Sequence, residues 1–362
     1  MKNPGVGEAR GFGVTERPGL SGGAWALYIW RGDEIRSWTM RLSLTFLLAL
    51  LHCTPAPAVL AQAYPSKPIR MIVPFPGAAL NDAIARAISQ SLSQSWGQPI
   101  VVENRAGANG NIGTDVCAKA APDGYTVCMP TGVVISLNPF AYSSMPFDPV
   151  RDLTPVIQVG ILDQVIAVNT SIAAKNIKEL LEVARAIPGG LNWASLGVGS
   201  SGHLYMEWVQ AKTGVQFTHI PYKGSQQLQM AVAAGEVHVT TNTPGGIRAN
   251  IEAGKVRPLA VVAGKNRAKA LPDVPTFLEQ GYDLDFRNWV AIYLPRNSPA
   301  ELARRWNTDV NKLLADTAYV EKHLGPWSVT AVGGSIDEFV NFMKRDRSMA
   351  GELMKIANLK LD

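Results

Sequence analysis

The chain has 362 residues, of which 47% are hydrophobic and 17% charged, and its 34 Lys and Arg against 29 Asp and Glu give a formal net charge of +5. Disordered chains combine low hydrophobicity with high net charge, and disulfide scaffolds are short and rich in cysteine, so the composition excludes both classes. The length is sufficient for two or three domains.

The N-terminal region has the organisation of a secretory signal peptide. Met40-Arg41 precedes an apolar stretch over 42–51, and a proline-containing segment then leads to Ala61-Gln62-Ala63. A basic start, an apolar run and a small-residue end are the three parts of such a signal. A membrane-spanning helix needs about 20 apolar residues, so this run is too short to be one. We expect cleavage before Tyr64, with cleavage before Gln62 as the alternative.

Removal of this signal changes the charge balance. We expect residues 40–63 to be the signal peptide and residues 1–39 to lie upstream of the true start. Together they carry six of the Lys and Arg and four of the Asp and Glu, which leaves 28 against 25, a net charge of +3, for the exported product. So small a charge, without any dense basic block, provides no electrostatic footprint for nucleic acid, and we expect none as a partner.

Two cysteines remain in the exported product. Cys117 and Cys128 are the only possible intramolecular pair, and an oxidising compartment permits a bond between them. The bond also requires Cα atoms within about 7 Å, which spacing in the sequence does not decide. Two buried free thiols are the alternative.

Strand-like and helix-like segments alternate along the chain, which is typical of α/β proteins with largely parallel sheets. Apolar residues four apart, for example Ile84, Ile88 and Leu92, indicate the helices. The expected strands are 69–75, 100–103, 125–129, 165–168, 191–195, 217–220, 237–241, 257–262 and 288–294. The expected helices run from 81 or 82 to 96 and over 114–120, 177–186, 203–213, 225–234, 247–253, 299–315 and 336–357.

The order of these segments indicates two α/β units, with the second inserted into the first. Strands near 157–168 and 284–294 adjoin the shifts in composition between the units. We expect lobe 1 to comprise 64–163 and 284–362, and lobe 2 to comprise 164–283. A cleft between two such units is a common site for a small ligand.

A glycine-rich loop follows one expected strand and precedes a helix. Gly197-Val-Gly-Ser-Ser-Gly202 fits the G-x-G-x-x-G pattern of dinucleotide sites. That site also needs an acid about 20 residues later, and the segment 217–222 contains no carboxylate, so the sequence argues against a nucleotide. Backbone N–H groups at a helix N-terminus, with hydroxyls from Ser200 and Ser201, would still form an anion site. The alternative is that these glycines only make a tight turn.

The same region contains serine and histidine side chains, which raises the question of catalysis. Ser200 and Ser201 lie close to His203, but neither serine sits in a G-x-S-x-G elbow. The other histidines of the exported chain show no spacing typical of metal ligands. We expect no catalysis and no metal.

Two charged residues have both a structural and a functional interpretation. Asp82 opens the first long helix, where it would cap the helix or accept a hydrogen bond from a ligand. Lys223 follows a strand end, where ligands collect in α/β sheets, or it is merely solvated.

A series of short motifs carries a family resemblance over essentially the whole exported chain. In order they are Tyr64-Pro-Ser-Lys-Pro-Ile-Arg-Met-Ile-Val-Pro-Phe75, Val102-Glu-Asn-Arg105, Asn111-Ile-Gly113, Ala121-Pro-Asp-Gly-Tyr125, Asn138-Pro139, Pro146-Phe-Asp-Pro149, Pro221-Tyr-Lys-Gly-Ser225, Ala253-Gly-Lys255 and Leu271-Pro-Asp-Val-Pro-Thr276. In these motifs the chain resembles the Bug-type solute-binding proteins, the extracytoplasmic receptors of tripartite tricarboxylate transporters.

The resemblance implies a two-lobed, type II-like periplasmic-binding-protein fold with the ligand in the cleft between the lobes. It implies a periplasmic monomer that is not an enzyme and has no cofactor. Such a receptor captures a small carboxylate (a di- or tricarboxylate, an acidic amino acid or an aromatic carboxylate) and delivers it to the membrane permease subunits. The alternative is a periplasmic ligand sensor that docks on a membrane signalling protein.

The resemblance also implies which residues wall the ligand cleft. They are Pro76, Gly77, Ala78, Ala79, Asp82, Thr131, Asn138, Ser195, Gly197, Gly199, Ser200, Ser201, His203, Tyr222, Lys223, Gly224, Asn242 and Trp289. The family usually has two glycines where this chain has Ala78 and Ala79, and an Asp is common where it has Asn242. A side chain at a glycine position restricts how closely a ligand approaches the backbone, so these departures change the expected geometry.

Overall fold

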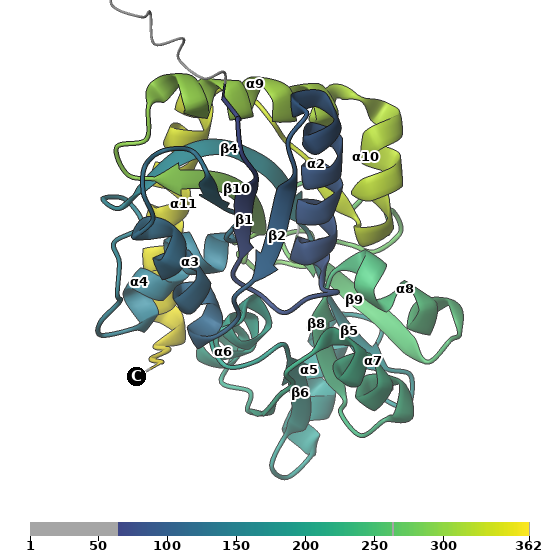
Figure 1. Cartoon of the computed structure of the whole chain (residues 1–362). Coiled ribbons are helices and arrows are strands. Elements are labelled where there is room, and N and C mark those ends of the chain that lie inside the picture. Colours follow the sequence, from purple (N-terminus) through teal and green to yellow (C-terminus); the bar gives the residue numbers. More distant parts are fainter. Residues whose placement is uncertain (1–63, 263, 362) are drawn as a thin grey trace, which may run out of the picture. The chain divides into compact units, whose positions relative to one another are not determined.

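The computed structural model describes residues 64–262 and 264–361, in which the chain forms two β-sheets flanked by helices (Figure 1). The segment 1–39 and the signal peptide expected at 40–63 lie outside the described residues. Within the described ranges, we find no helix with the length and apolar character that a membrane crossing requires.

The first sheet has six strands, and we call it and its helices lobe 1. Its order is β11-β4-β10-β3-β1-β2. The strands are β1 (Ile69–Val73), β2 (Ile100–Asn104), β3 (Thr126–Cys128), β4 (Leu153–Leu162), β10 (Asn288–Pro295) and β11 (Val329–Ala331). β1 runs parallel to both β2 and β3, whereas β10 is antiparallel to β3 and β4, and β11 is antiparallel to β4.

The second sheet has five strands, and we call it and its helices lobe 2. Its order is β7-β6-β8-β5-β9. The strands are β5 (Gln164–Asn169), β6 (Leu191–Ser195), β7 (Phe217–Pro221), β8 (Val239–Asn242) and β9 (Val256–Val262). β6 is parallel to β7 and β8, whereas β5 is antiparallel to β8 and β9.

The expectation of largely parallel sheets is therefore wrong, because both sheets are mixed. Parallel neighbours need a crossover connection, which the helices between β1, β2 and β3 and between β6, β7 and β8 provide. β4 ends at Leu162 in one sheet and β5 begins at Gln164 in the other, so these strands enter without such a crossover. Each of them pairs antiparallel with the neighbours in its own sheet: β4 with β10 and β11, and β5 with β8 and β9. Both sheets are mixed because the chain passes from one lobe to the other at this point.

The helices largely begin and end where the sequence predicts. Lobe 1 has α2 (Leu80–Trp96), η1 (Ala108–Gly110), α3 (Asn111–Ala118), η2 (Val133–Leu137), α4 (Asn138–Ala141), α9 (Ala300–Ala315), α10 (Thr317–His323), η3 (Gly325–Trp327) and α11 (Ile336–Ala357). Lobe 2 has α5 (Ile177–Ala186), α6 (Ser201–Thr213), α7 (Ser225–Ala234) and α8 (Pro244–Glu252). The sequence missed η2 and α4 because residues 131–138 are buried throughout and show no polar face.

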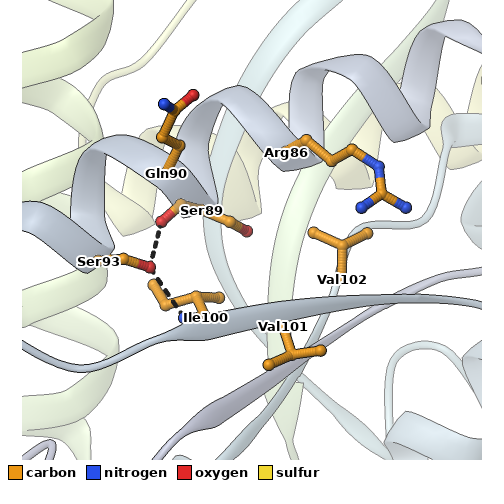
Figure 2. A pocket seen from close by; sticks show the side chains of 7 residues that line it. All are labelled: Arg86, Ser89, Gln90, Ser93, Ile100, Val101 and Val102. Carbon is orange, nitrogen blue, oxygen red and sulfur yellow. Dashed lines mark hydrogen bonds between the residues drawn. The ribbon is translucent and has the colours of Figure 1, made fainter.

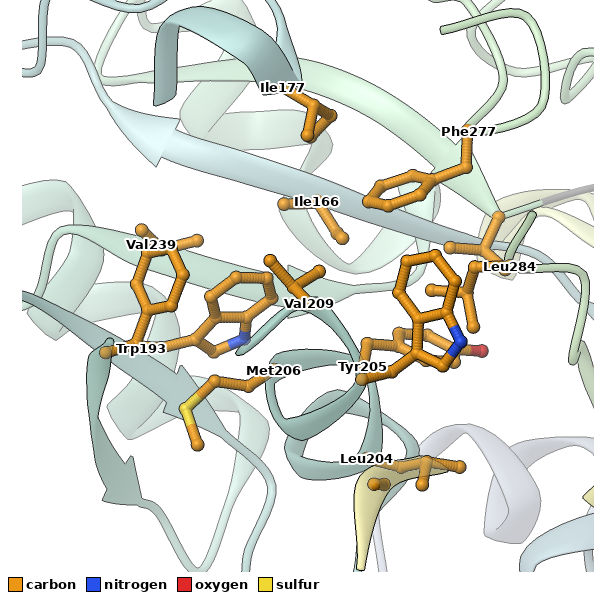
Figure 3. Packing of buried hydrophobic residues seen from close by; sticks show 14 of the residues in the cluster. Ile166, Ile177, Trp193, Leu204, Tyr205, Met206, Val209, Val239, Phe277 and Leu284 are labelled. Atoms are coloured by element: carbon orange, nitrogen blue, oxygen red, sulfur yellow. The ribbon is translucent and has the colours of Figure 1, made fainter. Parts of the chain in front are cut away.

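One large apolar cluster joins elements from both lobes. Figure 3 shows the part of it around Trp193 and Tyr205. Trp193, Tyr205 and Phe277 lie in it together with Leu353 and Met354 of α11. The long C-terminal helix therefore packs its apolar face against α6. This contact fixes the position of the residues at the start of α6.

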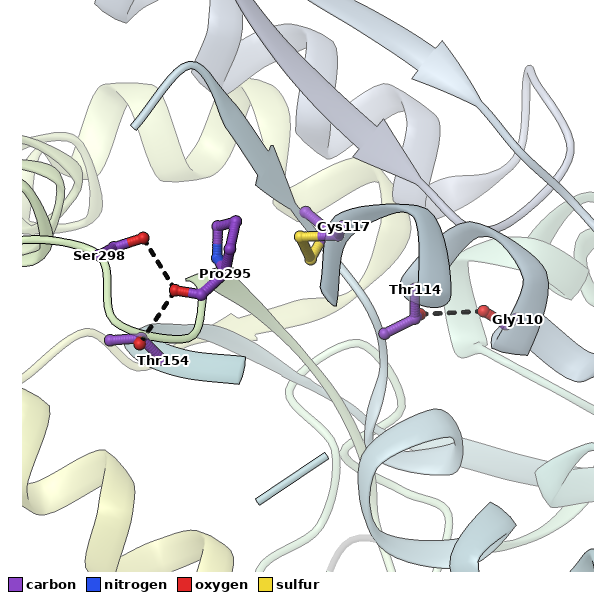
Figure 4. Close-up of a disulfide and its surroundings, with 7 residues drawn as sticks. Gly110, Thr114, Cys117, Thr154, Pro295 and Ser298 are labelled. Carbon is purple, nitrogen blue, oxygen red and sulfur yellow. Dashed lines mark hydrogen bonds between the residues drawn. A yellow bond between two sulfur atoms is a disulfide. The ribbon is translucent and has the colours of Figure 1, made fainter. Parts of the chain in front are cut away.

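A disulfide joins α3 to β3 (Figure 4). The Cα atoms of Cys117 and Cys128 lie 5.9 Å apart, within the range that a bond allows, and both side chains are fully buried. In the same helix, the Thr114 hydroxyl donates to the Gly110 carbonyl at 2.9 Å. The disulfide closes a short loop next to the end of β3, from which the chain continues to Thr131.

Candidate ligand-binding site

The loop from β1 to α2 presents a helix N-terminus without a side-chain cap. The N-cap residue is Ala79, which has no polar side chain to accept from the first amides of α2. Asn81 and Asp82, the second and third residues of α2, are buried, and Asn81 Oδ1 has no hydrogen-bond partner among the described residues. Such an N-terminus offers N–H donors to an anion.

Asp82 organises this loop from within. Its Oδ2 accepts from Ala78 N at 3.0 Å and from Arg86 Nε at 2.9 Å, and its Oδ1 lies 2.9 Å from an Arg86 Nη2. Arg86 also donates to Asn104 Oδ1, and Asn104 Nδ2 donates to the Phe75 carbonyl. Burial raises the pKa of Asp82, but the hydrogen bonds from Arg86 and Ala78 outweigh it, so the pKa lies below its usual value. The carboxylate is therefore ionised and already paired.

The backbone at Ala78 adopts the left-handed conformation, with φ of 60°. This conformation costs a residue with a Cβ about 1 kcal/mol relative to glycine. We expect Ala78→Gly to raise the free energy of unfolding by about 1 kcal/mol, measured by urea denaturation. Ala79→Gly is the matched control, because φ of −86° there carries no such cost, and this variant should be no more stable than the wild type. Equal changes in the two variants would contradict the prediction.

Thr131 follows β3 and lies beside the loop that follows β1, because Ile72 and Cys128 pair in the parallel ladder. Thr131 is buried, and its hydroxyl has no partner among the described residues. Unpaired buried hydroxyls are costly, so this one is available to a ligand.

Trp289 packs against this segment from the protein core. It is fully buried, and a Cβ added at Gly132 would lie 2.5 Å from its Nε1. Trp289 Nε1 donates to Asp346 Oδ2 at 2.8 Å, and the Ser136 hydroxyl donates to the same oxygen at 2.5 Å. Burial raises the pKa of Asp346 to about 6 against these two hydrogen bonds. The interpretation of a large aromatic as core, rather than as a ligand contact, fits this position.

The N-terminus of α6 provides the corresponding donors in lobe 2. Ser200 is the N-cap, and its Oγ accepts from His203 N and donates to the Gly197 carbonyl. The amides of Ser201 and Gly202, the first two positions of the helix, make no hydrogen bond to another described residue. Together with the Ser201 hydroxyl they are donors of the kind that binds an anion, whereas the Ser200 hydroxyl is used as the helix cap.

Two histidines lie behind this loop, and the sequence did not relate them. The rings of His203 and His219 stack with centroids 3.9 Å apart. His219 Nε2 lies 2.6 Å from Ser195 Oγ, and His203 Nδ1 accepts from Gly199 N at 3.1 Å. Because Nδ1 is an acceptor here, His203 is neutral. Burial lowers the pKa of both histidines to about 4, and for His219 the neighbouring ring adds to this.

Protonation of His203 predicts a stability that falls in acid. Its pKa is about 4 in the folded chain and about 6.5 unfolded, so the unfolded chain binds the proton first as pH decreases. This contribution to stability is present above pH 6.5 and lost towards pH 4. The variant His203→Gln keeps an acceptor for Gly199 N, because its amide oxygen can replace Nδ1. Between pH 7 and 5, we expect the free energy of unfolding, measured by urea denaturation, to fall by about 2 kcal/mol less in this variant than in the wild type.

Two buried carboxyls cancel from this comparison, whereas the pKa of His219, which His203 helps to lower, rises in the variant and adds to the difference. Burial raises the pKa of Asp163 and of Asp346 to about 6, which favours the folded chain below that pH and acts in the opposite direction. Both carboxyls are present in the wild type and in His203→Gln, so their effects cancel in the difference. Parallel pH profiles for the two proteins would contradict the assignment.

The remaining predicted residues follow the other parallel strands of lobe 2. Tyr222 is half-buried and its amide donates to the Ser195 carbonyl, while Lys223 is exposed. Gly224 is the N-cap of α7 and provides no side-chain cap. Asn242 is buried, and its amide nitrogen donates to Ser225 Oγ at 3.3 Å. Of the β1–α2 residues, Pro76 and Gly77 are exposed.

Hydrogen bonds of one residue, Asn109, join the two groups of loops. Its Nδ2 donates to Asn138 Oδ1 at 2.9 Å in lobe 1 and to the Gly199 carbonyl at 3.0 Å in lobe 2. The sequence analysis did not single out Asn109. Its only signal is an Asn-Gly pair in a glycine-rich loop, where asparagine tolerates a positive φ, here 51°.

A separate groove runs along the outer edge of lobe 1 (Figure 2). It lies between α2 and the edge strand β2, and Ser93 bridges the two elements by donating to Ser89 O and accepting from Ile100 N. Arg86 is its one connection to the Asp82 network. Among the described residues, no group of three His, Cys, Asp or Glu is arranged to hold a metal ion.

Comparisons with known proteins agree with this architecture. The model of the TctC family, the tripartite tricarboxylate transporter family receptor, matches residues 84–359. Protein BugT of Bordetella pertussis is 35% identical over 291 residues, which cover 77% of this chain and 88% of BugT. A solved periplasmic transporter is 34% identical with a TM-score of 0.75, covering 83% of this chain and 100% of that one.

A further solved structure, R. palustris Rpa4515 with adipate, is 31% identical with a TM-score of 0.76 and covers 82% of this chain and 99% of that one. The match to the family model extends over more than half of the chain, and the two sheets with their connecting strands reproduce the fold of these periplasmic proteins. The chain therefore belongs to the TctC family of tripartite tricarboxylate transporter receptors, which are binding proteins and not enzymes.

Proposed function

We propose that the chain captures a small carboxylate between its two lobes and delivers it to the membrane permease subunits of a tripartite tricarboxylate transporter. The ligand class comprises di- and tricarboxylates, acidic amino acids and aromatic carboxylates. In this proposal residues 40–63 direct export to the periplasm, residues 64–163 with 284–362 form lobe 1, residues 164–283 form lobe 2, and the receptor acts as a monomer.

The observation that carries the proposal is the pair of amides at the start of α6 that the Ser200 cap leaves without a partner among the described residues. Ser201 and Gly202 offer two amides and a hydroxyl, and α2 in lobe 1 begins without a side-chain cap. The nearby cations do not take this role: Arg86 is paired with Asp82, and Lys223 is exposed. Oriented amides at helix ends stabilise an anion without a cation.

The remaining predicted residues divide into two roles in this proposal. The residues that line the ligand site are Pro76, Gly77, Ala78, Ala79, Thr131, Ser201, Tyr222, Lys223, Gly224 and Asn242. The residues that hold these lining segments in place are Asp82, Asn138, Ser195, Gly197, Gly199, Ser200, His203 and Trp289. Thr131, with its unpaired hydroxyl, is the donor that lobe 1 adds to the anion site.

Adipate is a suitable first probe, since the R. palustris relative was solved with it. The exported protein, purified without refolding, is analysed by native mass spectrometry for a co-purified ligand and then titrated calorimetrically. The matched panel is adipate, hexanoate with one carboxylate, and the neutral isostere adipamide. We expect carboxylates of the panel to bind and adipamide not to bind. Equal binding of adipamide, or a co-purified sugar or cation, would argue against a carboxylate receptor.

A sensor that docks on a signalling protein would bind the same ligand. Gene deletion separates the two functions. Loss of uptake of the bound carboxylate supports the transporter, whereas intact uptake with loss of ligand-dependent transcription supports the sensor.

A further inference from the structure

The side-chain amide of Asn109 connects the two lobes at the edge of the candidate site. Asn109 lies in η1 of lobe 1, and its Nδ2 donates one hydrogen to Asn138 Oδ1 and the other to the Gly199 carbonyl. An amide nitrogen has two hydrogens, so both are used, one in each lobe. The side chain of Asn109 has no further donor to offer a ligand.

On the lobe 1 side, the orientation of this amide is fixed by its neighbours. Asn138 is fully buried, and its Nδ2 donates to Asn111 Oδ1 at 2.7 Å and to the Asn109 carbonyl at 3.2 Å. Because Asn138 directs its nitrogen to these acceptors, its oxygen is left for Asn109. The flanking side chains therefore require Asn109 to present its NH₂ group.

On the lobe 2 side, the peptide groups of Gly199 are engaged from both directions. Its carbonyl accepts from Asn109, and its N–H donates to His203 Nδ1. His203 Nε2 in turn lies 3.3 Å from Glu207 Oε1 on the same helix. A continuous chain of hydrogen bonds thus runs from Asn111 in lobe 1 to α6 in lobe 2.

The Gly199 position itself is adapted to close contact. Its φ is 80°, and an added Cβ would lie 2.4 Å from the Leu361 side chain and 3.1 Å from Asn109 Nδ2. The loop that contains Gly199 and leads into α6 is therefore in direct contact with lobe 1. Opening of the lobes would break the Asn109–Gly199 hydrogen bond.

We propose that Asn109 is an interlobe latch, a positioning residue that stabilises the closed arrangement whichever ligand is bound. The proposal rests on the proposed function only in that the two lobes open and close. A hydrogen bond made only in the closed state shifts the equilibrium toward that state, by about fivefold for one neutral bond. The latch thus adds to the affinity for every ligand without touching any.

The test measures the lobes without ligand. Spin labels at Gln94→Cys on α2 and Lys212→Cys on α6, both exposed, report the interlobe distance by pulsed electron resonance. Asn109→Asp keeps the shape and replaces the donor with an acceptor that repels Asn138 Oδ1 and the Gly199 carbonyl. Asn109→Gly removes the amide and still permits φ of 51°. The matched control is Asn297→Asp, at an exposed asparagine with φ of 63°.

We expect the ratio of the short-distance to the long-distance population to fall about fivefold in Asn109→Gly and about tenfold or more in Asn109→Asp, with Asn297→Asp unchanged. The dissociation rate of adipate should rise by the same factors, while thermal midpoints change little. Distance distributions that are the same in wild type and both Asn109 variants would overturn the latch. That outcome leaves the proposed function standing, since the calorimetric panel on the wild type tests it separately.

Discussion

Ser201→Asp should abolish carboxylate binding while leaving the fold intact. Ser201 is the first residue of α6, and its amide is unpaired among the described residues. An aspartate there places a carboxylate against the positive end of the helix, where it stabilises the helix by 0.3–1 kcal/mol but occupies and repels the anion site. We expect the affinity for adipate to fall by about 100-fold or more in calorimetry, which corresponds to about 2.7 kcal/mol.

Ala300→Asp provides the control for this variant. Ala300 is the first residue of α9 in lobe 1 and is exposed, so the same charge at an equivalent helix position should leave binding unchanged. Thermal denaturation of both variants separates loss of binding from loss of folding. If Ser201→Asp binds adipate as tightly as the wild type, the anion does not sit at α6.

Removal of the disulfide should produce the largest loss of stability. Cys117 and Cys128 are 11 residues apart, and closing a loop of that size in the unfolded chain is worth about 3 kcal/mol. We expect the double variant Cys117→Ala with Cys128→Ala to lose about that amount in urea denaturation. The loss acts mainly on the unfolded chain, so adipate affinity should change little.

Reduction of the wild type is the control for side-chain packing. Both cysteines are fully buried, so alanine also removes two sulfur atoms from the core. In a strong reductant the wild type loses only the disulfide, so its free energy of unfolding should fall by a similar amount. The free energy of unfolding of the double variant should not change. If the reductant does not change the stability of the wild type, the prediction that the disulfide stabilises the fold is wrong.

Much of the secondary structure was predictable because the signals for it are local. The expected bounds of α5, α7, α11 and β6 agree with the structure. α5 begins where Asn176 accepts from Glu179 N, and α11 begins with a capping box at Ser335. Caps and apolar periods act within a few residues, so a single sequence contains them.

The candidate site was predictable only as a set of loops. The glycine-rich loop indicated the start of a helix, and α6 begins there with Ser200 as its N-cap. The partners of individual side chains could not be deduced, as Asp82 illustrates. Capping and ligand contact were equally open for it, and the structure shows it bound to Arg86 and to the Ala78 amide.

The composition and motif order of the sequence by themselves determined an α/β chain of the receptor family with little net charge. Only the tertiary structure decided that both sheets are mixed, that His203 and His219 stack, and that Asn109 reaches Gly199. The physical reason is distance along the chain. Asn109 and Gly199 are 90 residues apart, and such a contact depends on how whole elements pack. In the proposed function the ligand anion is held by oriented amides rather than by free cations, which is compatible with the small net charge.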